Sequence, residues 1–187
     1  MATATATTRA TLDDLYRTEG KAELIDGRIV PLMATGVRPN QVAGNIYVSL
    51  YLFVQQRKKG KAFTDNMGFA VPKMLSGRES FSPDVSYFDG PLPANLMRFV
   101  NGPPTFGAEV RSENDYTPAA DIKIMNKRED YFAAGTLVVW DVDPIGETVT
   151  AYLTTAPTQP IIFHRGDIAH AEPAVPVWRI AVDEVFA

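Results

Sequence analysis

Cysteine is absent from the chain, and histidine occurs at only two positions. Without cysteine, disulfides and thiolate metal sites are excluded, and the composition suits a reducing cytoplasm, where we expect the protein to be located. Long hydrophobic runs are missing too. The longest dense apolar stretch, residues 46–54, is far shorter than the roughly 20 residues of a membrane helix. The polar start MATATATTRA also lacks the apolar core of a secretory signal, so we expect no membrane partner.

A surplus of basic residues is missing as well, because 18 basic and 22 acidic residues give a net charge of −4. Proteins that bind duplex DNA by broad charge attraction usually carry excess positive charge. Any contact with nucleic acid must therefore use a local basic patch or a bound cation. The run RKKGK at residues 57–61 is a candidate for such a phosphate-contacting patch. A solvated helix end is the alternative interpretation of this run.

The rest of the composition is that of one globular domain. Apolar residues make up 45% of the 187 positions and charged residues 21%, a balance that is typical of folded chains. This length suits one domain of ordinary size. We expect a disordered arm at residues 1–10, followed by a single domain over residues 11–187.

Local signals predict the order of the helices and strands. The capping-box pair Thr11 and Asp14 begins a short helix, and the Asp-Gly pair at 26–27 between apolar runs predicts a hairpin. Thr117 can cap a helix that has proline in its first position, and Gly135 can end that helix. The expected helices are a short one from residue 12, then 45–56 and 118–134. The expected strands are 22–25, 28–33, 67–71, 81–88, 105–112, 136–142, 148–153, 161–165 and 178–182, with 182–186 closing the chain.

These elements predict an α+β fold. The strand–helix–strand unit over residues 105–142 is expected to pair its two strands in parallel, whereas the later strands indicate antiparallel pairing. The predicted architecture is a mixed central β-sheet flanked by helices, with an N-terminal hairpin and C-terminal antiparallel strands.

Two of the expected strands carry a carboxylate among apolar neighbours. Because side chains alternate along a strand, Asp84 lies on the face opposite Val85, and Glu109 lies on the face opposite Ala108. A carboxylate in such a place is costly unless it is paired or bound to a cation. If the strands are neighbours, Asp84 and Glu109 can chelate one hard cation such as Mg²⁺ or Mn²⁺, which keeps waters that can serve as nucleophile. A nearby lysine would orient that water and stabilise charge on a phosphate.

A series of short segments runs through the chain in a fixed order. They are ELIDGRIV (23–30), SPDV (82–85), AEVRS (108–112), KREDYFAAG (127–135), VWDVDP (139–144) and DEVF (183–186). Together they resemble the Uma-type endonuclease family, formerly a domain of unknown function. That family belongs to the restriction-endonuclease-like superfamily, which has the PD-(D/E)XK signature. The resemblance covers nearly the whole chain.

The resemblance implies a restriction-endonuclease-like fold and a metal-dependent endonuclease that hydrolyses phosphodiester bonds of DNA. Its metal site would consist of Asp84, Glu109 and the carbonyl oxygen of Val110, with Glu23 as an auxiliary acid. DNA is the expected substrate, and a homodimer would allow both strands to be reached.

The sequence departs from the superfamily signature at Arg111, where a strict E-x-K motif has lysine. The family that it resembles usually lacks this lysine too and supplies one from the next helix, which implies Lys127, four residues before Tyr131. Lys123, one helical turn earlier, is the second candidate. Arg111 itself suits a carboxylate or phosphate clamp better than the orientation of a single water.

Each of these residues also has a purely structural interpretation. Asp84 could cap a turn, Glu109 could pair with Arg111 or a helix lysine, and a lone helix lysine is commonly solvated. The rival function is therefore a catalytically inactive binding or scaffold module on the same fold, and a third is hydrolysis of another phosphoester. A histidine site and a serine hydrolase are not expected, because histidine is scarce and no Gly-x-Ser-x-Gly motif occurs.

Overall fold

A six-stranded mixed sheet forms the centre of the protein. In the computed structural model, which describes residues 9–187, β8 and β9 run in parallel and the other neighbouring strands of this sheet are antiparallel. From one edge to the other the strands are β11 (Ala156–Phe163), β10 (Thr148–Leu153), β9 (Val138–Asp143), β8 (Phe106–Val110), β6 (Val85–Phe88) and β3 (Lys61–Phe63). The mixed central sheet and the α+β class predicted from the sequence are both confirmed.

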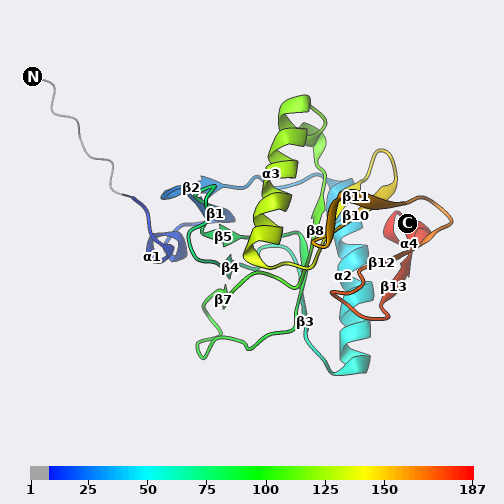
Figure 1. Cartoon of the computed structure of the whole chain (residues 1–187), viewed down its shortest axis with the longest axis horizontal. Coiled ribbons are helices and arrows are strands. Elements are labelled where there is room, and N and C mark those ends of the chain that lie inside the picture. Colours follow the sequence, from blue (N-terminus) through cyan, green and yellow to red (C-terminus); the bar gives the residue numbers. More distant parts are fainter. Residues whose placement is uncertain (1–8) are drawn as a thin grey trace, which may run out of the picture.

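Helices cover both faces of this sheet (Figure 1). On one face, α2 (Val37–Arg57) buries a stripe of residues spaced four apart, including Ile46 and Leu50, against Phe106 and Trp140. On the other face, α3 (Pro118–Ala134) buries Tyr131. Because side chains alternate along a strand, successive residues of β9 pack on opposite faces of the sheet, in the apolar cluster beside α2 or in the one beside α3. Among the described residues, no helix has the length and hydropathy needed to cross a membrane.

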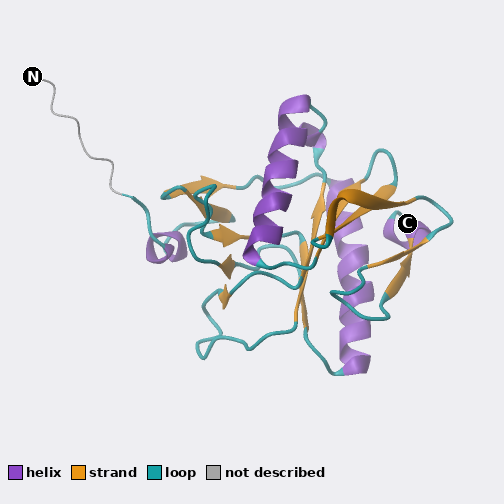
Figure 2. Ribbon diagram, viewed as in Figure 1, coloured by secondary structure: helices purple, strands orange, loops and turns teal. Residues whose placement is uncertain are grey.

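Smaller elements surround the central sheet (Figure 2). Short helices lie near both ends of the described chain and before α3: α1 (Leu12–Tyr16), η1 (Glu113–Asp115) and α4 (Val182–Val185). Three further sheets are formed by β1 (Ala22–Ile25) with β2 (Arg28–Pro31), by β5 (Ser80–Phe81), β4 (Phe69–Ala70) and β7 (Val100–Asn101), and by β12 (Ile168–His170) with β13 (Arg179–Ala181). The N-terminal hairpin and the first helix occur where they were predicted.

The first predicted helix has its capping box. The Thr11 side chain accepts a hydrogen bond from the backbone of Asp14, and Asp14 accepts one from the backbone of Thr11. Of the arm predicted at residues 1–10, residues 1–8 lie outside the described part of the chain. The next two residues contact the hairpin: Arg9 pairs with Asp26 at 3.2 Å, and the N–H of Ala10 donates to the carbonyl of Gly27 at 2.8 Å.

Helix α3 has the bounds that its capping residues predict. Thr117 Oγ1 accepts from the N–H of Ala120 at 3.2 Å, and Pro118 occupies the first turn. Gly135 ends the helix with a φ of 113°, a left-handed conformation that glycine adopts without strain. The chain then enters β9, which lies parallel to β8. The predicted strand–helix–strand unit is confirmed.

Several predicted boundaries are wrong. The helix expected at 45–56 begins at Val37, because Pro39 falls in its first turn, where proline costs no hydrogen bond. The strand expected at 81–88 is two strands, β5 and β6, separated around Pro83 and lying in different sheets. Strands β3, β7 and β12 were not predicted. Strand β11 begins at Ala156, before its two prolines, which an edge strand tolerates.

Candidate active site

Asp84 immediately precedes β6, and Glu109 lies on the neighbouring strand β8. Strands β6 and β8 are antiparallel with Val85 paired to Ala108, so Asp84 and Glu109 are the residues next to this pair, at the same end of the two strands. The Asp84 carboxylate also accepts a hydrogen bond at Oδ2 from the N–H of Val110, at 2.8 Å. The backbone of residue 110 therefore lies beside the Asp84 carboxylate, on the face that α3 covers.

Both oxygens of Glu109 are occupied by side chains of α3. Lys127 Nζ lies 2.9 Å from Oε2, and the Tyr131 hydroxyl donates to Oε1 at 2.6 Å. The Glu109 side chain is 24% exposed. Burial raises its pKa, the ammonium of Lys127 opposes this shift, and the nearby charges of Asp84 and Glu23 add to it, so that the pKa lies above its ordinary value. With Lys127 as its only cationic partner, Glu109 is therefore harder to ionise in the folded protein than in water.

Lys127 joins two acids. Its ammonium contacts Glu23 at 3.1 Å as well as Glu109, and its side chain is 18% exposed. Burial by itself would lower the pKa of Lys127, but the carboxylates of Glu109 and Glu23 outweigh burial and raise it. Lys127 is therefore a charged donor at neutral pH and is unsuited to act as a base. Tyr131 follows it by one helical turn, so both side chains leave the same face of α3.

Glu23, from β1, is the most buried acid of the site, with a side chain that is 3% exposed. Oε1 accepts from the N–H of Ser82 at 3.0 Å, and Oε2 contacts Arg78 Nη1 at 2.5 Å. Burial alone would raise the pKa of Glu23, but Lys127 and Arg78 outweigh it and hold the pKa below its ordinary value. Glu23 is therefore a fixed negative charge that positions Lys127.

Arg78 is a site residue that the sequence did not reveal. Its guanidinium binds Glu23 on one side and Asp130 of α3 on the other, the latter at 2.8 Å, and lies 5.1 Å from the centroid of the Phe81 ring. It thereby ties the N-terminal hairpin to α3. In the sequence Arg78 stands among glycine and polar residues of a loop and gives no signal of this role.

Lys21 was also missed. Its ammonium lies 3.2 Å from Asp84 Oδ1 and also forms an ion pair with Asp65. A signal did exist, because Lys21 and Glu23 are two residues apart and strand alternation sets them on one face. The candidate site thus contains two lysines, Lys127 beside Glu109 and Lys21 beside Asp84.

Lys123 and Arg111 lie outside this cluster. Lys123 is exposed, and within residues 9–187 it has no ion pair or side-chain hydrogen bond. Arg111 lies on the same face as Glu109 but is bound at 2.8 Å by both oxygens of Asp141, and at 2.9 Å by Asp121. Its charge is therefore neutralised by structural partners.

The basic run at 57–61 lies away from the two carboxylates. Lys61 is paired in register with Phe88, at the end of β6 opposite to Asp84. Lys58 ends α2 in a left-handed conformation, and Lys59 pairs with Asp89 at 3.0 Å. This arrangement favours the interpretation of the run as a solvated helix end.

The donor set fits a hard divalent cation held by few protein ligands. In the described part of the chain, no group of three or more acidic or histidine side chains stands ready to hold an ion. Magnesium, however, is usually bound through one or two carboxylates and keeps waters and substrate phosphates as its other ligands. Asp84 and Glu109, at the same end of β6 and β8, supply two carboxylates, and the backbone at residue 110 is adjacent to Asp84.

Comparison with known proteins points to nucleases. A family model with the description "Uma2: Putative restriction endonuclease" matches residues 9–183. Among solved structures, the chain is similar to a protein described as "a putative nuclease belonging to DUF820" from Anabaena variabilis. The TM-score is 0.73 at 19% identity, and the match covers 94% of this chain and 97% of that one. No curated protein matches the chain.

Proposed function

The chain belongs to the Uma2 family of restriction-endonuclease-like proteins, and we propose that it is a divalent-metal-dependent endonuclease that hydrolyses phosphodiester bonds of DNA. The observation that carries the proposal is that Asp84, beside the backbone of Val110, and Glu109 meet at one end of the adjacent strands β6 and β8, with a charged lysine from the following helix on Glu109. The family match and the grouping of two carboxylates with a lysine both support metal-assisted hydrolysis of a phosphodiester bond.

In this proposal Asp84, Glu109 and the carbonyl oxygen of Val110 hold Mg²⁺ or Mn²⁺. Such a cation lowers the pKa of a bound water and stabilises negative charge on the phosphate. It would also offset the cost of ionised Glu109, whose pKa is raised by burial and then by the charges of Asp84 and Glu23. Because the positive charge that would contact the phosphate is concentrated at this one site, the proposal requires no surplus of basic residues in a chain whose net charge is −4.

Lys127 would donate to a non-bridging phosphate oxygen and to the attacking water. Its ammonium remains charged, because Glu109 and Glu23 together outweigh the effect of burial on its pKa. Glu23 is itself fixed by Arg78, so that the position of the ammonium is set by a chain of ion pairs from β1 to α3. Lys123, exposed and one turn earlier on α3, remains the second candidate for this role.

A second candidate function is supported by the same ion pairs. Both carboxylates are already neutralised by ammonium groups, Asp84 by Lys21 and Glu109 by Lys127, so the cluster could serve only to join the hairpin, the sheet and α3. In that case the protein would be an inactive binding or scaffold module. Metal binding distinguishes the two functions, because a cluster with a purely structural role is not expected to bind a divalent cation.

Calorimetric titration with Mn²⁺ tests the proposal. The wild type should bind the ion, and Asp84→Asn should bind it at least about tenfold more weakly. Asp89→Asn is the matched control, since Asp89 follows the other end of β6 and pairs with Lys59 at the surface. Equal binding by wild type and Asp84→Asn, or the absence of binding by the wild type, would contradict the assignment of the site.

A further inference from the structure

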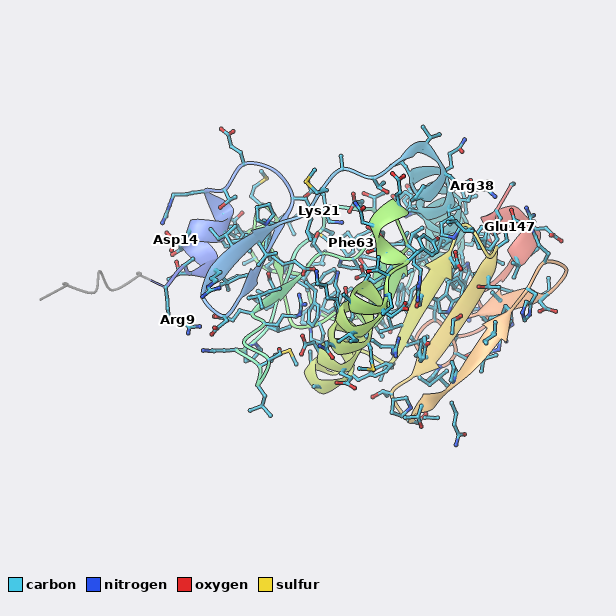
Figure 3. All side chains as sticks on the ribbon, turned by 90° about the horizontal axis from the view of Figure 1, so that it is seen from above. Arg9, Asp14, Lys21, Arg38, Phe63 and Glu147 are labelled. Atoms are coloured by element: carbon cyan, nitrogen blue, oxygen red, sulfur yellow. The ribbon has the colours of Figure 1, made fainter. Side chains whose placement is uncertain are left out.

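Lys21 stands at the beginning of the N-terminal hairpin, on the side that faces α3 (Figure 3). Its carbonyl accepts a hydrogen bond from the N–H of Leu32 at 2.9 Å, which fixes its backbone to the hairpin. Its side chain is 16% exposed, and its ammonium is shared between Asp84 and Asp65. The residue is therefore held in place from both ends.

The charge of Lys21 is maintained by its neighbours. Burial alone would lower its pKa, but Asp84 in the first place, followed by Asp65 and Glu109, raises the pKa above its ordinary value. Lys21 is therefore charged at neutral pH, and its ammonium lies between the carboxylates of Asp84 and Asp65.

Each oxygen of the Asp84 carboxylate already has one partner. Its Oδ2 accepts from the N–H of Val110, and its Oδ1 contacts Lys21. A cation that binds Asp84 through Oδ1 would lie close to the ammonium group of Lys21, and the repulsion between the two charges favours release of the ammonium. Asp65 offers the displaced group a second partner, since the same ammonium already contacts it and its own side chain is exposed.

We propose that Lys21 is a built-in counter-ion of the cation site. In the metal-free protein it neutralises Asp84, and when a divalent ion binds, its ammonium is released to Asp65. Lys21 thus competes with the metal and sets the affinity of the site, while keeping the metal-free protein folded. This inference rests on the proposed function, because it assumes that a cation binds at Asp84.

The test is calorimetric titration of Mn²⁺ into four proteins: wild type, Lys21→Met, Lys21→Arg and Lys73→Met. Lys21→Met should bind the ion about tenfold more tightly than wild type, because a partly buried competitor has been removed. Lys21→Arg keeps the competing charge and should bind no more tightly than wild type. Lys73→Met removes the same charge from an exposed lysine whose partner Asp26 lies 3.7 Å away, and its affinity should stay close to that of wild type.

Thermal melting supplies a readout that is independent of binding heat. In EDTA, Lys21→Met should melt below wild type, since Asp84 then faces Glu109 without a counter-ion, and Mn²⁺ should raise its melting temperature more than that of wild type. Asp65→Asn, a change at the surface, serves if Lys21→Met fails to fold. It should weaken Mn²⁺ binding by about threefold, because the released ammonium loses its second partner.

The possible outcomes distinguish the counter-ion role of Lys21 from the proposed function. If wild type binds Mn²⁺ and Lys21→Met binds it equally or more weakly, the counter-ion role is wrong and the proposed function stands. If Asp65→Asn binds like wild type, the release to Asp65 is wrong. If neither wild type nor any Lys21 variant binds Mn²⁺, the proposed function fails, and the inference fails with it. Measurable binding by wild type together with tighter binding by Lys21→Met would support both.

Discussion

Replacing Lys127 by methionine removes the ammonium that joins Glu23 to Glu109 and keeps a side chain of similar length. Removing one partner of a fully buried ion pair costs about 3–5 kcal/mol, because the other charge is left unpaired. Here both acids keep another partner. Glu23 retains Arg78, and Glu109 retains Tyr131 and is 24% exposed. We therefore expect Lys127→Met to lower the free energy of unfolding by about 1–3 kcal/mol at neutral pH.

The loss should shrink as the pH falls toward 4.5, the ordinary pKa of Glu109. The pKa of Glu109 is already raised by burial and by Asp84 and Glu23, and removal of Lys127 raises it further, so that the carboxylate of the variant becomes protonated. A protonated Glu109 no longer needs a cation. Urea denaturation of wild type and variant at both pH values measures the two differences.

Lys123→Met is the matched control for Lys127→Met, since it removes the same charge from an exposed position one helical turn earlier. Its effect on the free energy of unfolding should stay within about 0.5 kcal/mol. An equally small effect of Lys127→Met at neutral pH would refute the argument that this ammonium stabilises two buried carboxylates.

Three further changes test the network around Lys127. Tyr131→Phe removes the 2.6 Å hydrogen bond to Glu109 and should cost about 1–2 kcal/mol in urea denaturation, and a neutral effect would show that the hydroxyl is unimportant. Arg78→Met leaves Glu23, 3% exposed, with a weaker set of partners, and should cost about 3–5 kcal/mol, so a loss below about 1 kcal/mol would contradict its role as a clamp. The stability of wild type should fall as the pH rises above 4.5, the ordinary pKa of Glu109, because the folded protein holds that proton more tightly. Glu109→Gln should lack this slope, and its persistence in the variant would assign it to another group. The lowered pKa of Glu23 acts with the opposite sign, since its stabilisation is lost as the pH falls below 4.5.

Local chemistry explains which parts of the fold were predictable. Helix α3 was predicted from end to end because Thr117, Pro118 and Gly135 act through the adjacent backbone alone. The start of α2 was missed because Pro39 indicates a loop unless it falls within the first helical turn. Strand β3 was missed because it begins at the last lysine of a basic run and its three residues acquire their strand character only by pairing with β6.

In the site, too, features set by the local sequence were predictable, whereas contacts between residues distant in sequence were not. The faces of Asp84 and Glu109 were predicted from alternation along each strand, and in the structure both residues lie at the same end of β6 and β8. Lys21 and Arg78 were missed because their partners are distant in sequence. Lys21 lies 63 residues from Asp84, and Arg78 lies 55 residues from Glu23, so only the packing of the hairpin against the sheet and α3 brings them together.

Cleavage of supercoiled plasmid DNA tests the central claim most directly. Wild type with Mg²⁺ or Mn²⁺ should nick or linearise the plasmid, and excess EDTA should abolish the reaction. Asp84→Asn should be inactive with either ion, whereas Asp89→Asn should cleave like wild type. Cleavage by Asp84→Asn at the wild-type rate, or by wild type in EDTA, would contradict a metal-dependent site at Asp84 and Glu109.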